Sequence, residues 1–123
     1  MKLRLSHNAM RFRLSVSEAL RLKEQGRVSD ALELPRGQRF DYVLLTDGSE
    51  SPIQVEWGGA QLEIRLPTAM TQAFLASSDE SWSHAIATDS GVLTVRIEKD
   101  LPCAHGDGPN PQADRFNSKQ FGV

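Results

Sequence analysis

Cationic side chains recur at alternate positions in several short segments of the chain. Where polar and apolar residues alternate in a β-strand, the polar side chains collect on one face. On this face we place Lys2, Arg4, Arg11, Arg13, Arg65 and Arg96. The forked guanidinium group of arginine matches the oxygens of phosphate and carboxylate. The pattern predicts a site for a small anionic or phosphorylated ligand, with Glu98 orienting one of the arginines.

Three glutamates at the same polar positions support a second function. Glu56, Glu63 and Glu98 could hold Mg²⁺ through carboxylate oxygens while the arginines neutralise a phosphate. The chain would then be a Mg²⁺-dependent phosphohydrolase, and only this alternative calls for a cofactor. A third interpretation is a structural or interaction module, such as a homodimer, whose arginines and glutamates pair across a solvated face. The residues leave open whether the chain is an enzyme.

Two further residues of types that bind metal ions lie close together near the C-terminal end, Cys103 and His105. A structural Zn²⁺ site normally needs four ligands. Only His7 and His84 remain among the histidines, and the chain has no Cys-x-x-Cys motif. We therefore assign no metal site and keep four candidates for metal ligation. These are Glu56, Glu63, Cys103 and His105.

Periodicity and turn residues predict the helices and strands that carry these side chains. Ser15 and Glu18 form a capping-box pattern that opens a helix, which Gly26 ends. A second helix follows Pro67 and covers residues 68–76. Alternating or apolar runs predict strands over residues 2–6, 10–14, 28–34, 39–46, 53–57, 61–66, 81–88 and 91–99.

The order of these elements is the same in both halves of the chain. Residues 2–46 and 53–98 each read strand–strand–helix–strand–strand, which predicts a duplicated ββαββ unit. A slide of 52 positions superposes Phe12 on Ile64 and Val43 on Val95. We expect one α+β domain over residues 1–99, with residues 100–123 as a C-terminal extension. Eight mainly antiparallel strands favour a closed barrel or a strongly curved sheet. The competing architecture is an open sheet with both helices on one face.

Composition narrows the class of protein. The chain has 123 residues, of which 39% are hydrophobic and 24% charged, as in an ordinary globular domain. A net charge of −2 argues against a nucleic-acid partner. No run of 18 apolar residues is present, so we expect no membrane association. The single cysteine suits a reducing compartment, and we expect a cytoplasmic protein.

The predicted order of elements, taken with the charged face, resembles the CYTH-like triphosphate-tunnel fold. That fold is an antiparallel eight-stranded barrel with a charged lumen. The resemblance implies a phosphorylated ligand and Mg²⁺ or Mn²⁺ held by tunnel carboxylates. Members carry Glu-x-Glu-x-Lys on the first strand, whereas residues 2–6 here read Lys-Leu-Arg-Leu-Ser. The triphosphatase signature is therefore absent from this chain.

The whole chain also resembles a family of small uncharacterised bacterial proteins. The residues that carry this resemblance are Lys2-Leu3-Arg4-Leu5, Asn8 and the run 11–15. A Glu-Lys-Asp-apolar-x-Cys signature completes it at residues 98–103. The family implies an uncharacterised protein and no activity.

Overall fold

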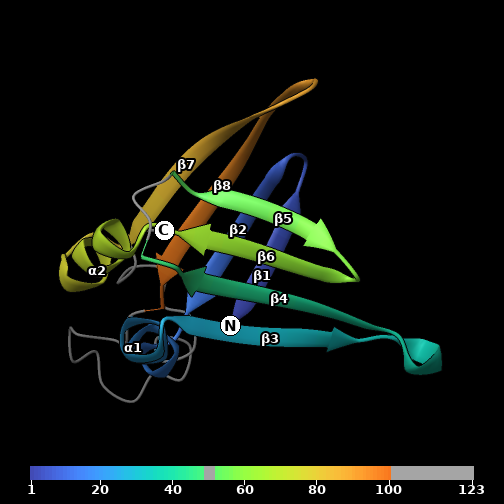
Figure 1. The fold of residues 1–123 in the computed structure, drawn as a ribbon, viewed down its shortest axis with the longest axis horizontal. Helices are drawn as coiled ribbons and strands as arrows, with labels where there is room; N and C mark the ends of the chain where they lie inside the picture. The colour runs from blue at the N-terminus through green and yellow to red at the C-terminus, as the bar shows by residue number, and fades with distance from the viewer. Residues whose placement is uncertain (49–51, 101–123) are drawn as a thin grey trace, which may run out of the picture.

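The computed structural model describes residues 1–48 and 52–100 (Figure 1). Each predicted strand and helix is present in these residues. The elements in chain order are β1 (Lys2–Ser6), β2 (Ala9–Leu14), α1 (Val16–Gln25), β3 (Arg27–Glu33), β4 (Arg39–Thr46), β5 (Gln54–Gly58), β6 (Gln61–Leu66), α2 (Thr68–Ala76), β7 (Ser81–Thr88) and β8 (Gly91–Lys99). A short 3₁₀ turn, Pro35–Gly37, joins β3 to β4.

The first helix begins and ends where its sequence signals predict. The Ser15 hydroxyl accepts a hydrogen bond from the backbone N–H of Glu18, and the Glu18 carboxylate accepts one from the N–H of Ser15. This reciprocal pair is the capping box. Gly26 then takes the left-handed conformation at φ 74° and donates to the carbonyl of Leu22. Gly26 thereby ends the helix and turns the chain into β3.

The eight strands form two separate four-stranded sheets. One has the order β1-β2-β8-β7 and is here named the β2–β8 sheet. The other has the order β3-β4-β6-β5 and is named the β4–β6 sheet. In each sheet the two central strands run parallel, and both outer pairs are antiparallel. Each sheet therefore joins a hairpin from one half of the chain to a hairpin from the other.

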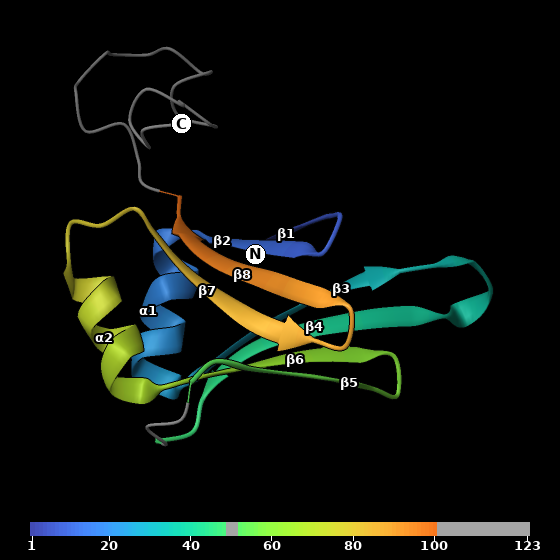
Figure 2. The same cartoon turned by 90° about the horizontal axis from the view of Figure 1, so that it is seen from above.

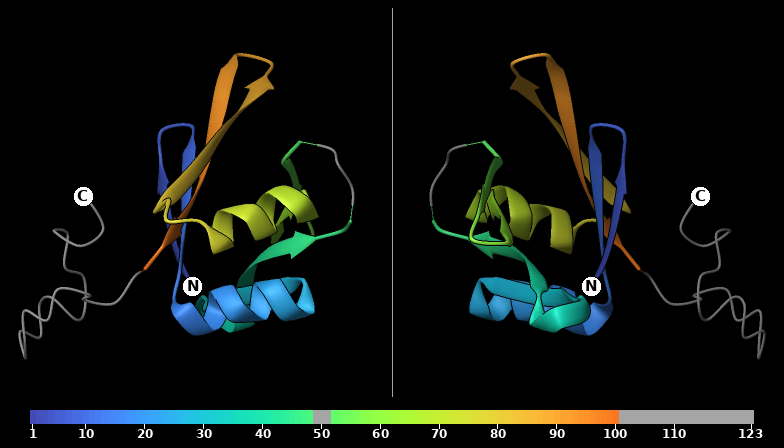
Figure 3. Two further views of the ribbon diagram at one scale, coloured as in Figure 1. Left: turned by 90° about the vertical axis from the view of Figure 1, so that its left-hand side faces the viewer. Right: turned by 90° about the vertical axis from the view of Figure 1, so that its right-hand side faces the viewer.

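The expected closed antiparallel barrel is wrong, and so is the single open sheet. The strands divide between two open sheets because β2 pairs with β8 and β4 pairs with β6. Figure 2 shows the sheets as two layers, with α1 and α2 together at one end. Figure 3 shows the same layers from that end and from the opposite one. Among the described residues no tunnel is lined by all eight strands, and the predicted cations do not line a lumen.

The two ββαββ halves occupy corresponding places in the two sheets. Advancing each strand by four in chain order converts β1-β2-β8-β7 into β5-β6-β4-β3, which is the second sheet. The register differs by one residue from the predicted slide in β4 and β8. Val95 lies beside Met10 in one sheet, and Tyr42 lies beside Leu62 in the other. Val95 therefore corresponds to Tyr42, not to Val43. A shift of one residue moves a side chain to the opposite face.

One apolar core fills the space between the sheets. Phe12, Ile64, Leu44 and Ile97 come from the central strands and are at most 1% exposed. The helices contribute mainly Leu22 from α1 and Phe74 from α2. The alternating apolar positions thus face inward on both sheets, as predicted. It follows that the two polar faces point away from each other, on opposite sides of the molecule.

Candidate functional site

The outer face of the β2–β8 sheet brings most of the predicted cations together. We name it the arginine face and define it as Lys2, Arg4, Arg11, Arg13, Arg96 and Glu98. Strand register sets these side chains in two rows. One row runs Lys2, Arg13, Glu98 across β1, β2 and β8, and the next runs Arg4, Arg11, Arg96. Neighbouring strands lie about 4.8 Å apart. The second row therefore holds three arginines side by side.

A single buried carboxylate organises the arginine face. The Glu98 side chain is 8% exposed. Arg13 donates to its Oε1 from Nε at 3.3 Å and from Nη2 at 3.2 Å. The Nε atoms of Arg96 and Arg11 lie 3.2 Å and 3.5 Å from its Oε2. Three guanidinium groups thus share one carboxylate, which leaves the face with net positive charge.

The row of three arginines borders a hollow of about 210 Å³. Arg4, Arg11 and Arg96 line it, with the hydroxyl groups of Ser6 and Thr94 beside them. Arg96 also donates from Nη2 to the Ser81 hydroxyl at 3.0 Å, which holds its guanidinium toward β7. Within the described residues Arg4 has no carboxylate at ion-pair distance. The hollow therefore presents guanidinium and hydroxyl donors to solvent without an acidic residue on its wall.

The structure places Arg65 apart from the other predicted cations. Arg65 lies on β6, on the outer face of the β4–β6 sheet, where three carboxylates surround it. The Glu63 carboxylate lies 2.9 Å from its Nη2, Asp47 lies 3.6 Å from Nη1 and Glu56 lies 3.7 Å from Nε. We name these four residues the acidic face. The negative charges, first Glu63 and then Glu56, raise the pKa of the Arg65 guanidinium.

The three glutamates predicted to share Mg²⁺ do not meet. Glu56 and Glu63 are register partners on β5 and β6, whereas Glu98 lies on β8 in the other sheet. Glu56 and Glu63 each already form an ion pair with Arg65. The described residues contain no group of three acidic, histidine or cysteine side chains placed to hold a metal ion. Cys103 and His105 lie outside the described residues.

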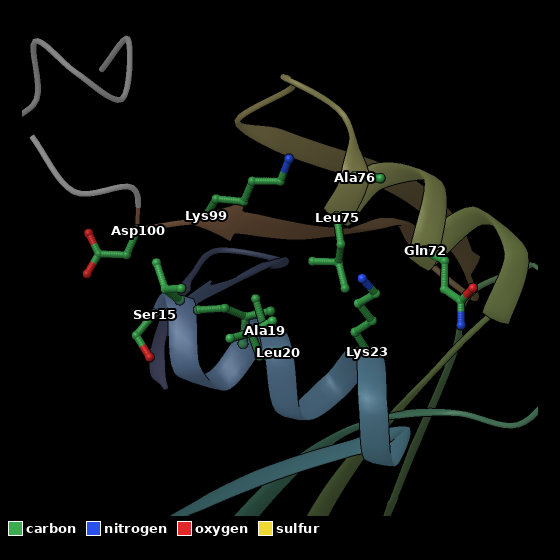
Figure 4. A pocket seen from close by; sticks show the side chains of 11 residues that line it. Ser15, Ala19, Leu20, Lys23, Gln72, Leu75, Ala76, Lys99 and Asp100 are labelled. Atoms are coloured by element: carbon green, nitrogen blue, oxygen red, sulfur yellow. The ribbon is translucent and has the colours of Figure 1, made fainter. Parts of the chain in front are cut away.

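Periodicity alone did not indicate a groove between the two helices (Figure 4). Val16 and Leu20 lie on its rim and are 52% and 48% exposed. The sequence signal for the groove was the spacing of four residues between Val16 and Leu20, which places both on one face of α1. Leu22, which is buried, lies on a different face. This spacing indicates an exposed apolar face only when the side of α1 that packs on the core is known.

Comparison with known proteins identifies a family for the chain, but no activity is known for that family. The model described as "Family of unknown function (DUF7009)" matches residues 1–120. Searches among curated proteins and among solved structures found no match. Within the part of the chain that the structure describes, no helix is long and apolar enough to cross a membrane.

Proposed function

Because the chain belongs to a family of unknown function, DUF7009, we propose a function from its charged surfaces: it binds a small anionic or phosphorylated ligand on the arginine face. The ligand would sit in the hollow lined by Arg4, Arg11 and Arg96. The observation that supports this most is the row of these three arginines, aligned by register on adjacent strands. Together they offer a wall of donors suited to one anion.

The balance of charge on this face supports the proposal. The arginine face carries five cationic side chains and one carboxylate, in a chain whose net charge is −2. Glu98 is already shared by Arg11, Arg13 and Arg96, so it neutralises only part of their charge. Arg4 is exposed and free of ion pairs with the described residues. An anion in the hollow would complete the charge balance that Glu98 leaves incomplete.

The chemistry expected at this site is recognition. Guanidinium groups keep their charge at any physiological pH and cannot act as general acids or bases. The ionisable lining of the hollow consists of arginines, and the nearest carboxylate, Glu98, is fully engaged by them. The structure of the face therefore supports a binding protein better than a Mg²⁺-dependent phosphohydrolase.

A thermal-shift titration tests the proposal. The full chain would be heated with inorganic phosphate, pyrophosphate, a nucleoside triphosphate or citrate, each with and without Mg²⁺. A ligand that binds only the folded state raises the Tm, and the rise grows with the logarithm of the ligand concentration above the Kd. We expect a rise with at least one of these anions and no requirement for Mg²⁺.

Matched arginine variants locate the effect. Arg4→Gln should abolish the rise, whereas Arg27→Gln should preserve it. Arg27 is an exposed arginine on β3 in the other sheet and serves as the control. No rise with any anion at millimolar concentration would contradict the proposal. A rise that both variants reduce equally would also contradict it, because that result indicates unspecific ion binding.

An exposed aromatic patch favours the interaction module as a second candidate function. Trp57 is 66% exposed and packs edge-on against Phe40, with ring centroids 5.6 Å apart. Leu32, the register partner of Phe40, is 53% exposed. Apolar surface of this kind often marks a protein contact. Sedimentation of the full chain should then show a dimer that Trp57→Ser dissociates, and a monomeric native chain would exclude this candidate.

A further inference from the structure

The groove between α1 and α2 has an apolar wall and a volume of about 230 Å³. Its apolar lining comes from both helices and from the end of β2. The side chains are Leu14, Val16, Ala19, Leu20, Leu75 and Ala76. Figure 4 shows Leu75 of α2 pointing across the groove toward α1, with Lys23 below it and Ala19 and Leu20 to one side. The helices lie beside each other here without closing over these side chains.

The core accounts for only part of this apolar strip, because Leu14 belongs to the core and Ala19 and Leu75 pack against it, whereas Val16 and Leu20 do not. Leu22 of α1 and Phe74 of α2 already point into the core. Val16, Leu20 and Lys23 fall at spacings of four and three residues, so they share a second face of α1. Val16 and Leu20 are about half exposed on that face. A bound apolar chain would remove them from water, which is favourable in proportion to the area covered.

The charges at the groove are unequally distributed along it. Figure 4 shows Lys23 and Gln72 at one end and Ser15 and Asp100 at the other. The Lys99 ammonium is already engaged, because it donates to the Ser77 carbonyl at 2.7 Å and lies 4.6 Å from the centre of the Phe74 ring. Lys23 has no ion pair within the described residues. The groove therefore offers one available cation at the end remote from Asp100.

We propose that this groove binds a medium-chain alkyl carboxylate. The alkyl chain would lie along Val16, Leu20 and Leu75, and the carboxylate would pair with Lys23. Asp100 sets the direction in which the ligand lies, because its negative charge repels a carboxylate placed at its own end of the groove. This site uses none of the residues of the arginine face, and it stands or falls separately from the proposed anion site.

A calorimetric titration of the full chain with hexanoate, octanoate and decanoate, below their micelle concentrations, tests the proposal. Each methylene that enters the groove should strengthen binding about threefold to fourfold. Lys23→Gln should weaken decanoate binding by about twofold to fivefold, as expected for an exposed ion pair. The same variant should leave the affinity for 1-decanol unchanged, since the alcohol carries no charge.

Two control variants separate a groove effect from a general one. Leu20→Gln should weaken decanoate binding strongly, whereas Leu32→Gln, an exposed leucine on β3, should leave it unchanged. Arg21→Gln on α1 is the charge control for Lys23→Gln, since Arg21 does not line the groove. The proposal is overturned if decanoate does not bind, or if its affinity is independent of chain length and of Lys23. It is also overturned if Leu20→Gln changes the oligomeric state, because the groove would then be occupied by a second copy.

Discussion

The arginine face and the acidic face occupy corresponding places in the two sheets, yet their charges are inverted. On the arginine face three arginines surround one carboxylate, Glu98. On the acidic face three carboxylates surround one arginine, Arg65. Arg13 and Arg65 hold equivalent register positions in β2 and β6, so the two clusters share one arginine position and differ in its neighbours.

Three positions account for most of the inversion. Where the arginine face has Arg11 the acidic face has Glu63, and where it has Arg4 the acidic face has Glu56. Glu98 corresponds to Leu45, so the acidic face lacks a carboxylate at the centre. The same backbone arrangement tolerates either sign of charge. The sign of the charge is therefore set by the side chains at these positions, not by the fold.

The largest expected effect comes from removing the carboxylate at the centre of the arginine face. Glu98→Gln keeps the shape of the side chain and leaves three guanidinium groups without a counter-charge. Because Glu98 is buried, we expect a loss of about 3 kcal/mol in the free energy of unfolding. Urea unfolding measures the loss. Sulfate should reduce it more than chloride at equal ionic strength, because sulfate can take the place of the carboxylate.

The matched control lies on the acidic face. Glu63→Gln leaves Arg65 with two carboxylates and should have little effect on stability. Equal losses of stability for Glu98→Gln and Glu63→Gln would contradict this comparison, because Glu98 would then stabilise the fold no more than Glu63 does.

A smaller effect is expected from removing the arginine at the centre of the acidic face. Arg65→Gln leaves Glu56, Glu63 and Asp47 facing one another. These side chains are more exposed than Glu98, so solvent screens their repulsion. We expect a loss roughly a third as large as that of Glu98→Gln. Urea unfolding at low and high salt measures it, and a loss that grows with salt would contradict the electrostatic explanation.

The smallest expected effect on the free energy of unfolding comes from replacing Glu18, a carboxylate that belongs to neither face. Burial opposes the charge of Glu18, but hydrogen bonds from the Met1 amino group and the Ser15 backbone outweigh it and lower the pKa of Glu18 below its ordinary value of 4.5. A carboxylate with a lowered pKa contributes stability above its unfolded pKa and loses it as pH falls through the folded pKa. Glu18→Gln retains the capping-box geometry. It should cost about 0.5 kcal/mol at pH 7 and nothing well below pH 4.5.

This pH dependence is read from the difference between native and Glu18→Gln unfolding curves over an acid series. A difference that persists at the acid end would assign the effect to helix capping instead of charge.

Local patterns in the sequence sufficed to predict the elements and the two sides of each strand. The capping box at Ser15 and the turn at Gly26 located α1, and alternation assigned Phe12 to the core and Arg13 to the outer face. These features depend on neighbours in the chain. Glu98 was also expected beside an arginine, and in the structure it contacts three.

The pairing of distant hairpins could not be predicted in the same way. β2 and β8 are joined by contacts between residues about 85 positions apart, such as Met10 with Val95. Alternation states that a side chain faces outward but not which sheet it belongs to. Alternation alone therefore groups Arg65 with the other cations, although it lies on the acidic face. Because alternation does not predict which strands pair, it favours a single barrel where two sheets form.

We propose that the arginine face binds an anion and that the acidic face does not. Nuclear magnetic resonance of the arginine Nε–Hε groups during a titration of the full chain with inorganic phosphate tests this directly. We expect saturable shifts at Arg4, Arg11 and Arg96, with Arg27 and Arg65 unchanged. Uniform, non-saturating shifts at all arginines, or shifts confined to the acidic face, would contradict it.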